Sequence, residues 1–120
     1  MSSLDCTFCQ LVPEDAWLST PLVMAIPHPE PAGPCHLIVA PRRHVPTFYD
    51  LDIVEQRALW DALAELRERI SLNIAVPGFQ AGFVDAPRGE EAGFHTFVHL
   101  IPRLTPQPVA LPPGAQWVEL

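Results

Sequence analysis

The strongest constraint on the fold is a single change in the spacing of apolar residues at Asp52. From there to about residue 75, apolar side chains recur at helical intervals, which predicts one long helix with a buried stripe. The stripe consists of Leu59, Leu63, Leu66 and Ile70, with Trp60 widening it. Asp52 followed by Glu55 predicts a capping box at the helix start, and the residues VPG at 76–78 stop the helix. The charged residues expected to lie mostly away from the stripe are Glu55, Arg57, Asp61, Glu65, Arg67 and Glu68.

Short apolar runs bounded by turn residues lie on both sides of this helix. The runs WLSTPLVMAIP and CHLIVAP precede it, FQAGFV and FHTFVHLI follow it, and all are typical of β-strands. A further short strand is expected near the C-terminus. The 15 prolines show no repeat and are expected in rigid connections. Together these patterns predict an α+β fold, an antiparallel sheet carrying one main helix, in a single domain over residues 1–120.

The charge balance argues against a nucleic-acid-binding surface. The chain carries 14 acidic residues against 7 arginines and no lysine, for a formal net charge of −7. No apolar run approaches the ~20 residues of a membrane-spanning helix, and the N-terminus lacks the profile of a secretory signal. We therefore expect a cytoplasmic protein that binds neither nucleic acid nor membrane.

Cys6 and Cys9 form a Cys-x-x-Cys pair, whose spacing lets two thiolates hold one metal ion. The same pair could be a redox couple or two ordinary reduced thiols. A zinc site needs two further ligands, and the available histidines are His28, His36, His44, His95 and His99. His44 follows one predicted strand and His95 opens another, so a sheet could bring both beside the cysteines. Each histidine could instead be an ordinary surface or core residue, and Cys35 is expected to be an inert buried thiol.

Three blocks of the sequence resemble the histidine-triad (HIT) family of nucleotide hydrolases and transferases. They are CTFCQLV near the start, GPCHLIVAPRRHV in the middle and HTFVHLIPR near the end. The resemblance implies an α+β fold with a five-stranded antiparallel sheet, usually paired in a homodimer. It also implies a zinc site formed by Cys6, Cys9, His44 and His95. Two thiolates and two imidazoles complete a tetrahedral zinc, so this site would be structural.

The resemblance fails at the position of the catalytic nucleophile. In the family, the central histidine of His-x-His-x-His attacks phosphorus and forms a covalent nucleotidyl intermediate. That position is Phe97 here, between His95 and His99 on one face of the predicted strand. A benzyl side chain has no lone pair for the attack, so the usual mechanism is not expected.

Other positions that hold the nucleotide in the family are changed as well. Glu91 replaces a glutamine next to the phosphate-holding serine or threonine, and a carboxylate there would repel phosphate. His28 stands where an aspartate commonly holds the ribose hydroxyls. Gln80 and Asp85 are among the residues at the usual asparagine positions. The candidate ligand-binding residues are His28, Gln80, Asp85, Glu91 and Arg103.

Three functions are compatible with this pattern. The first is a zinc-stabilised HIT-like protein without nucleotidyl hydrolase activity, whose former nucleotide cleft binds a small molecule, nucleotide-like or not, or a protein partner. Phe97 would then make the cleft floor apolar and aromatic. The second is a diverged enzyme with His99 near the phosphate site, although His99 could equally be a ring fixed by a backbone hydrogen bond. Its candidate acids and bases are His99, His28, Glu90 and Glu91, and Arg43, Arg88 or Arg103 could orient an anion. The third is a conventional HIT nucleotide hydrolase, which would need attack by water or by another residue.

Overall fold

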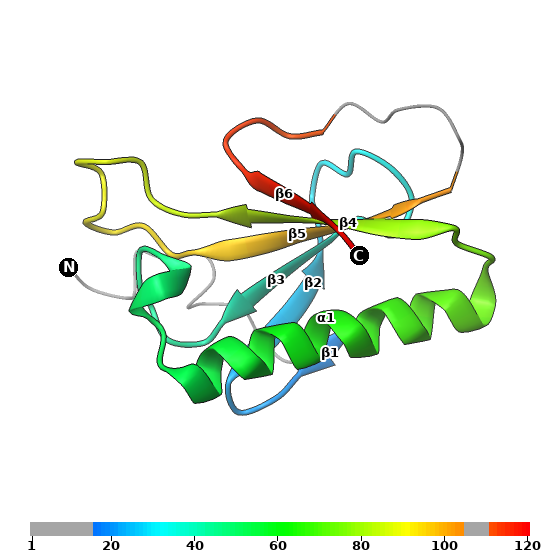
Figure 1. Ribbon diagram of the computed structural model, residues 1–120, viewed down its shortest axis with the longest axis horizontal. Helices are drawn as coiled ribbons and strands as arrows, with labels where there is room; N and C mark the ends of the chain where they lie inside the picture. The colour runs from blue at the N-terminus through cyan, green and yellow to red at the C-terminus, as the bar shows by residue number, and fades with distance from the viewer. Residues whose placement is uncertain (1–15, 105–110) are drawn as a thin grey trace.

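The computed structural model describes residues 16–104 and 111–120, so Cys6 and Cys9 lie outside the described residues. Within the described residues, six strands form one antiparallel sheet in the order β1-β2-β3-β5-β4-β6 (Figure 1). The strands are β1 Leu18–Ser19, β2 Val23–Pro27, β3 Leu37–Pro41, β4 Gly78–Val84, β5 Phe97–Arg103 and β6 Gln116–Glu119. This sheet and its long helix confirm the predicted α+β fold. The sheet has six strands where the resemblance implied five, because the short strands β1 and β6 form its two edges.

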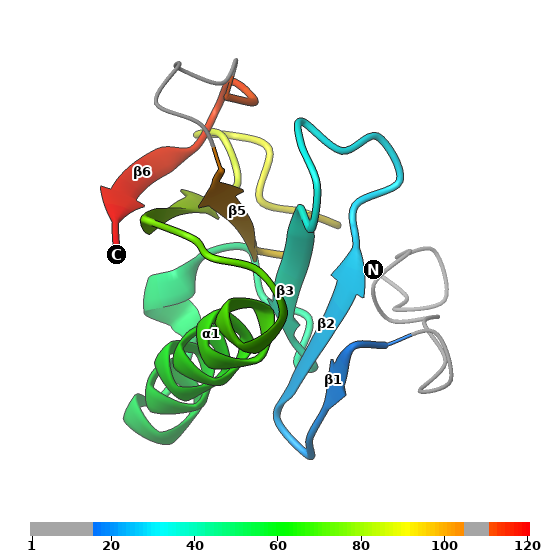
Figure 2. The ribbon, with the colours of Figure 1, turned by 90° about the vertical axis from the view of Figure 1, so that its right-hand side faces the viewer.

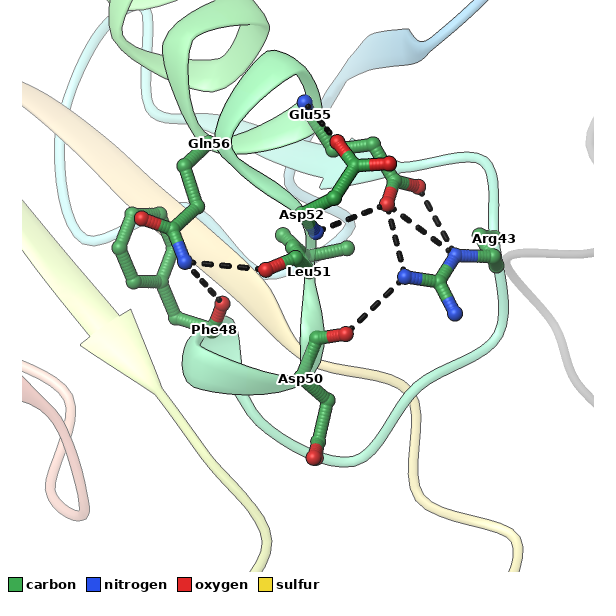
Figure 3. Close-up of polar contacts among 7 residues, drawn as sticks. All are labelled: Arg43, Phe48, Asp50, Leu51, Asp52, Glu55 and Gln56. Carbon is green, nitrogen blue, oxygen red and sulfur yellow. Dashed lines mark hydrogen bonds and ion pairs between the residues drawn. The ribbon is translucent and has the colours of Figure 1, made fainter.

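The long helix α1, Ile53–Asn73, begins where the sequence predicts. The Asp52 carboxylate accepts a hydrogen bond from the Glu55 backbone N–H at 2.8 Å, and the Glu55 carboxylate accepts one from the Asp52 N–H at 3.0 Å (Figure 3). This capping box satisfies two N–H groups at the helix start and so fixes where α1 begins. Across the described residues, no helix is both long enough and apolar enough to cross a membrane.

Glu55 does not point away from the protein interior as expected. It is only 6% exposed, and its carboxylate accepts hydrogen bonds from Nε and Nη2 of Arg43 at 2.7–3.2 Å (Figure 3). Arg43 Nη2 also donates to the Asp50 carbonyl at 3.0 Å. The hydrogen bonds from Arg43 lower the pKa of Glu55 to about 2, against the opposing effect of burial. Arg43, which directly precedes His44, is therefore tied to the start of α1.

The hydrophobic core lies between α1 and one face of the sheet (Figure 2). The helix contributes the predicted stripe, Leu59, Leu63, Leu66 and Ile70, all of it buried. Alternate strand residues meet the helix, namely Val23, Ala25, Leu37, Val39, Phe79, Ala81, Val98 and Leu100. Trp60 lies at the margin, 42% exposed, with its ring 5.3 Å from that of Phe83. Residues between the core positions belong to the opposite face of the sheet, and Gly82, Phe97 and His99 are among them.

Candidate functional site

The region that resembles the histidine triad spans the start of β5. His95 precedes the strand, which begins at Phe97. Phe97 pairs with Val84 and His99 pairs with Gly82 on β4, so Phe97 and His99 lie two positions apart on one face. Their rings meet edge to face, with 5.1 Å between the centroids. This face is the one that points away from α1.

His99 is buried among rings instead of facing an open cleft, with an exposure of 4%. Two of these rings come from the connection between β2 and β3, drawn in cyan in Figure 2: His28 at its start and His36 at its end. The ring centroids are 4.4 Å apart for His28 and His36, 5.1 Å for His36 and His99, and 5.5 Å for His28 and His99. Each ring offers a nitrogen within 4.8 Å of the others. We call His28, His36 and His99 the histidine cluster.

Hydrogen bonds determine where the protons of the histidine cluster lie. The Ala32 backbone N–H donates to His36 Nδ1 at 2.9 Å, so the neutral His36 ring carries its proton on Nε2. His36 Nε2 lies 3.0 Å from His99 Nδ1 and donates to it, which leaves the His99 proton on Nε2. The Glu30 N–H donates to His28 Nδ1 in the same way, at 2.9 Å. Backbone donors thus select the same tautomer in His28 and His36.

The two buried rings of the cluster are neutral at pH 7. Burial is the largest cause of the low pKa of His36, about 4, and the neighbouring His28 and His99 lower it further. Burial also lowers the pKa of His99 to about 4, with a smaller contribution from His28. At pH 7 these rings can therefore form hydrogen bonds or ligate a metal, but they supply no positive charge to attract a phosphate.

A fourth ring, Trp117 on β6, lies against His99. Trp117, Gly82 and His99 form one row across β6, β4 and β5. The indole stacks on the His99 ring, with 5.7 Å between centroids and 18° between planes. It fits because Gly82 has no side chain: a Cβ there would stand only 2.6–2.8 Å from indole carbons. A glycine inside a strand often marks such a close approach.

The two predicted zinc ligands within the described residues, His44 and His95, are neighbours. Their ring centroids are 5.0 Å apart and their planes are nearly perpendicular, at 77°. His95 is buried, and its Nε2 donates to the Pro41 carbonyl at 2.7 Å, so the lone pair lies on Nδ1. Burial is the largest cause of the lowered pKa of His95, and the bond to Pro41 opposes it. A carbonyl on one ring nitrogen is a usual partner of a metal-ligating imidazole, so these two rings fit the predicted site.

Two of the other predicted ligand-binding residues have structural partners. The Asp85 carboxylate accepts a hydrogen bond from the Phe48 backbone N–H at 2.8 Å and lies 3.0 Å from the Thr96 hydroxyl. It therefore ties the loop after β4 to the segment before β5. Arg103, at the far end of β5 from Phe97, forms an ion pair of 2.7 Å with Glu119 and so holds β6 to the sheet.

The remaining candidates lie on β4 and in exposed loops. Glu91 accepts a hydrogen bond from the Gly89 N–H at 3.2 Å within the exposed loop between β4 and β5. Gln80 lies on β4 opposite Ile101, two positions from Gly82. Cys35, expected to be buried, is half-buried and adopts φ 59° immediately before His36. Of the predicted ligand-binding residues, the structure brings only His28 to His99.

The match to a known family covers most of the chain. Residues 10–105 match the HIT domain. The chain belongs to the HIT family. A curated relative of this HIT domain, the bifunctional bis(5'-adenosyl)-triphosphatase/adenylylsulfatase FHIT of Arabidopsis thaliana, is 29% identical over 91 residues. The match covers 76% of this chain and 51% of the relative, so the chain spans about half of the relative's length.

Solved structures share the fold at low sequence identity. A hypothetical protein from Leishmania major has a TM-score of 0.74 at 17% identity, covering 99% of this chain and 86% of its own. The NitFhit protein of C. elegans has a TM-score of 0.67 at 24% identity, covering 77% of this chain and 23% of its own. A HIT family member from Bacillus subtilis has a TM-score of 0.70 at 19% identity, covering 82% and 73%. The HIT domain match ends at residue 105, so β6 with Trp117 lies beyond it.

Two residues of the site, His36 and Trp117, have no role assigned from the sequence alone. For His36 the sequence offers only the alternation of strand residues, which places His36 on the same face as Ile38. The structure pairs Ile38 with His99, so that face is the one that carries His99. For Trp117 the signal is Gly82, a glycine inside a predicted strand. Neither signal names a partner until the strand order β3-β5-β4-β6 is known.

Proposed function

We propose that this HIT-domain protein binds a small ligand at the face of β5 that carries Phe97 and His99, and that it does not hydrolyse nucleotides through a nucleotidyl-enzyme intermediate. The observation that carries the proposal is Phe97. Its ring lies where the resemblance places the nucleophile, two positions before His99 and on the same face. A phenyl ring cannot attack phosphorus.

The strand register supports this proposal because it leaves no neighbouring residue to replace Phe97. The Thr96 N–H donates to the Val45 carbonyl at 2.8 Å, and its hydroxyl donates toward the Val84 carbonyl at 2.8 Å. Val98 is 2% exposed and belongs to the core. A slip of one residue would move Val98 out of the core and would turn every side chain of β5 to the other face.

The charges in and around the site favour a ligand with less negative charge than a nucleoside polyphosphate. Arg43 and Arg103 are ion-paired at 2.7 Å with carboxylates of α1 and β6. The loop between β4 and β5 carries two exposed carboxylates, Glu90 and Glu91, against one exposed arginine, Arg88. An aromatic ring such as Phe97 suits stacking or an uncharged group. A nucleotide-like ligand is the alternative suggested by family membership, and a protein partner is the other.

Activity measurements test the loss of the family mechanism. Incubation with adenosine phosphoramidate and with diadenosine polyphosphate is expected to give no turnover, and the intact mass spectrum no nucleotidyl adduct. An adduct on the unmodified chain would contradict the proposal. Phe97→His, compared with the apolar control Phe97→Leu, shows which residues account for the missing activity. If Phe97→His hydrolyses these substrates, only the nucleophile is missing. If it is inactive, the changes at His28 and Glu91 contribute as well.

Ligand binding can be tested separately by thermal shift, because a ligand that binds only the folded chain raises its melting temperature. Adenosine and AMP carry the same base and sugar and differ in the phosphate. We expect the shift with adenosine to equal or exceed that with AMP. A larger shift with AMP would contradict a ligand of low charge, and no shift with either would favour the protein partner.

A diverged enzyme is the second candidate function. The observation that favours it is the histidine cluster, because the neutral His99 ring carries its proton on Nε2 and could donate a hydrogen bond that stabilises a leaving group. His99→Asn should abolish such an activity, whereas Phe97→Leu should preserve it. A hydrolase activity that survives His99→Asn would exclude a required role for His99.

We further propose that zinc bound by Cys6, Cys9, His44 and His95 stabilises the fold, with support from the neighbouring rings of His44 and His95. Elemental analysis of the purified chain should detect this ion, and a chelator should lower the melting temperature. A homodimer and a cytoplasmic location are also part of the proposal. Light scattering during gel filtration would show a monomer if the homodimer is wrong.

A further inference from the structure

The histidine cluster has the dimensions of a metal site. Zinc lies about 2.0–2.1 Å from each imidazole nitrogen, so a tetrahedral site places these nitrogens about 3.4 Å apart and the ring centroids about 5 Å apart. The centroids of the cluster are 4.4, 5.1 and 5.5 Å apart. The closest nitrogens, Nε2 of His36 and Nδ1 of His99, are 3.0 Å apart. An ion between them would require only a small separation of the two rings.

The surroundings of the cluster also suit a cation. His36 and His99 are buried at 2% and 4% exposure, while His28 is partly exposed, so the cluster reaches the surface at His28. Arg43 and Arg103 have carboxylate partners elsewhere and put no positive charge here. Among the described residues, no other three histidine, cysteine, aspartate or glutamate side chains converge in this way.

We propose that His28, His36 and His99 form a metal site for a divalent late transition ion, with zinc as the expected occupant, separate from the site at His44 and His95. Three imidazoles suit zinc, copper and nickel and leave one position of a tetrahedral ion for water or for a ligand atom. That open position would select ligands that carry an oxygen or nitrogen donor. Metal binding at the cluster is measured without substrate, so its failure would leave the proposed function untouched.

The present hydrogen bonds oppose the ion, and their free energy decides how strongly. Ligation through Nε2 of His28 and His36 requires the proton of each ring to move to Nδ1, where the N–H groups of Glu30 and Ala32 now donate. Each such hydrogen bond contributes little net free energy, because an equivalent bond to water replaces it when it breaks. Glu30 is exposed and Ala32 partly exposed, so water can replace these bonds. Coordination of zinc by imidazoles releases much more free energy than two such bonds contribute, so the ion would bind with a local change at Glu30 and Ala32.

Metal content provides the first test. Cys6→Ser together with Cys9→Ser removes two predicted ligands of the other site and leaves the cluster intact. At equilibrium dialysis against free zinc, which also detects an exchangeable ion, this double variant should bind about one ion per chain, and adding His28→Ala should abolish this binding. A metal-free double variant, or an ion that survives His28→Ala, would overturn the proposal. If the double variant does not fold, the unmodified chain is compared with His28→Ala alone, and equal zinc contents would overturn it.

Trp117 provides the second test because its indole stacks on His99. Trp17 and Trp60 are each 42% exposed, so Trp17→Phe with Trp60→Phe should fold and leave Trp117 as the reporter. Cobalt(II) should quench its fluorescence with saturation at one equivalent beyond any bound at the cysteine site, and His28→Ala should prevent this. In an NMR spectrum of the backbone amides, the signals of Glu30 and Ala32 should shift on zinc binding. Unquenched fluorescence, or quenching unchanged by His28→Ala, would refute a site at the cluster.

Discussion

Two groups of histidines lie along β5, one just before the strand begins and one around His99 within it, and they differ in what holds the second nitrogen of each ring. The Nε2–H group of His95 donates a hydrogen bond to the Pro41 carbonyl. Nδ1 therefore carries the lone pair, and this tautomer can bind a metal ion through Nδ1. In the histidine cluster, His28 and His36 accept backbone N–H groups at Nδ1, so their Nε2 atoms carry protons. His95 can therefore bind the proposed zinc without changing its tautomer, whereas His28 and His36 must change theirs to bind an ion. We expect tight metal retention at His95 and weaker, exchangeable binding at the cluster.

The largest expected effect is the difference between His95→Ala and His28→Ala. His95→Ala removes a predicted zinc ligand and the buried bond to Pro41, so we expect it to reduce the free energy of unfolding by about 3 kcal/mol or more. His28 is partly exposed, and His28→Ala should cost about 1 kcal/mol or less. Urea unfolding of the zinc-loaded proteins measures both. Similar losses of unfolding free energy in the two variants would show that His95 does not bind metal more tightly than the cluster does.

Chelation is the control for this pair of variants. Removing metal from the unmodified chain should bring its stability close to that of His95→Ala, because both would then lack the proposed zinc. His95→Ala itself should respond much less to the chelator. If the chelator lowers the stability of both equally, the effect of His95→Ala comes from packing and from the lost Pro41 bond.

Gly82→Ala should have the next largest effect, because it disturbs the cluster without changing a histidine. The new Cβ would stand 2.6–2.8 Å from Trp117 ring carbons, so the indole must leave His99. Overpacking of this kind typically costs about 1–3 kcal/mol. Denaturant unfolding gives the loss, and the fluorescence spectrum reports the new surroundings of Trp117.

Trp117→Ala supplies the matched background for Gly82→Ala. Without the indole, alanine at a strand position should be neutral or stabilising by about 0.5–1 kcal/mol, because glycine loses more backbone freedom on folding. A loss of the same size in both backgrounds would mean that the indole does not depend on Gly82.

The two regions also differ in how far their residues could be predicted. The helix start was predictable because Asp52 and Glu55 act on each other over three positions of chain. The fold class was predictable because apolar spacing records which residues face the core. The cluster was not, since it joins His28 and His36 to His99 through the order of strands β3 and β5, which local spacing does not record. The pairing of Arg43 with Glu55 was missed because it depends on how the connection between β3 and α1 folds back, which local spacing does not record either.

The smallest expected effect concerns Glu55, whose ion pair holds Arg43 and, through the chain, the adjacent His44. Glu55→Gln retains a residue that can complete the capping box and removes only the charge, so we expect a loss of about 0.5–1 kcal/mol at pH 7. The sign of the pH dependence follows from the pKa of Glu55, lowered from 4.5 to about 2 in the folded chain. Its contribution is complete above about pH 4.5 and disappears as the pH falls toward 2. The difference in unfolding free energy between the unmodified chain and Glu55→Gln should therefore shrink over that interval. The nearby carboxylates of Asp50 and Asp52 are present in both proteins, so the comparison isolates Glu55.

Glu55→Gln also separates the two histidine groups from each other. Because Arg43 directly precedes His44, loosening it should speed the release of zinc from the site of His44 and His95 to a chelator. Quenching of Trp117 by cobalt(II) should be unchanged, because neither Glu55 nor Arg43 bonds to a ring of the cluster. If both readouts changed together, the two groups would form one coupled site, and the difference in their hydrogen bonds would not set their separate metal affinities.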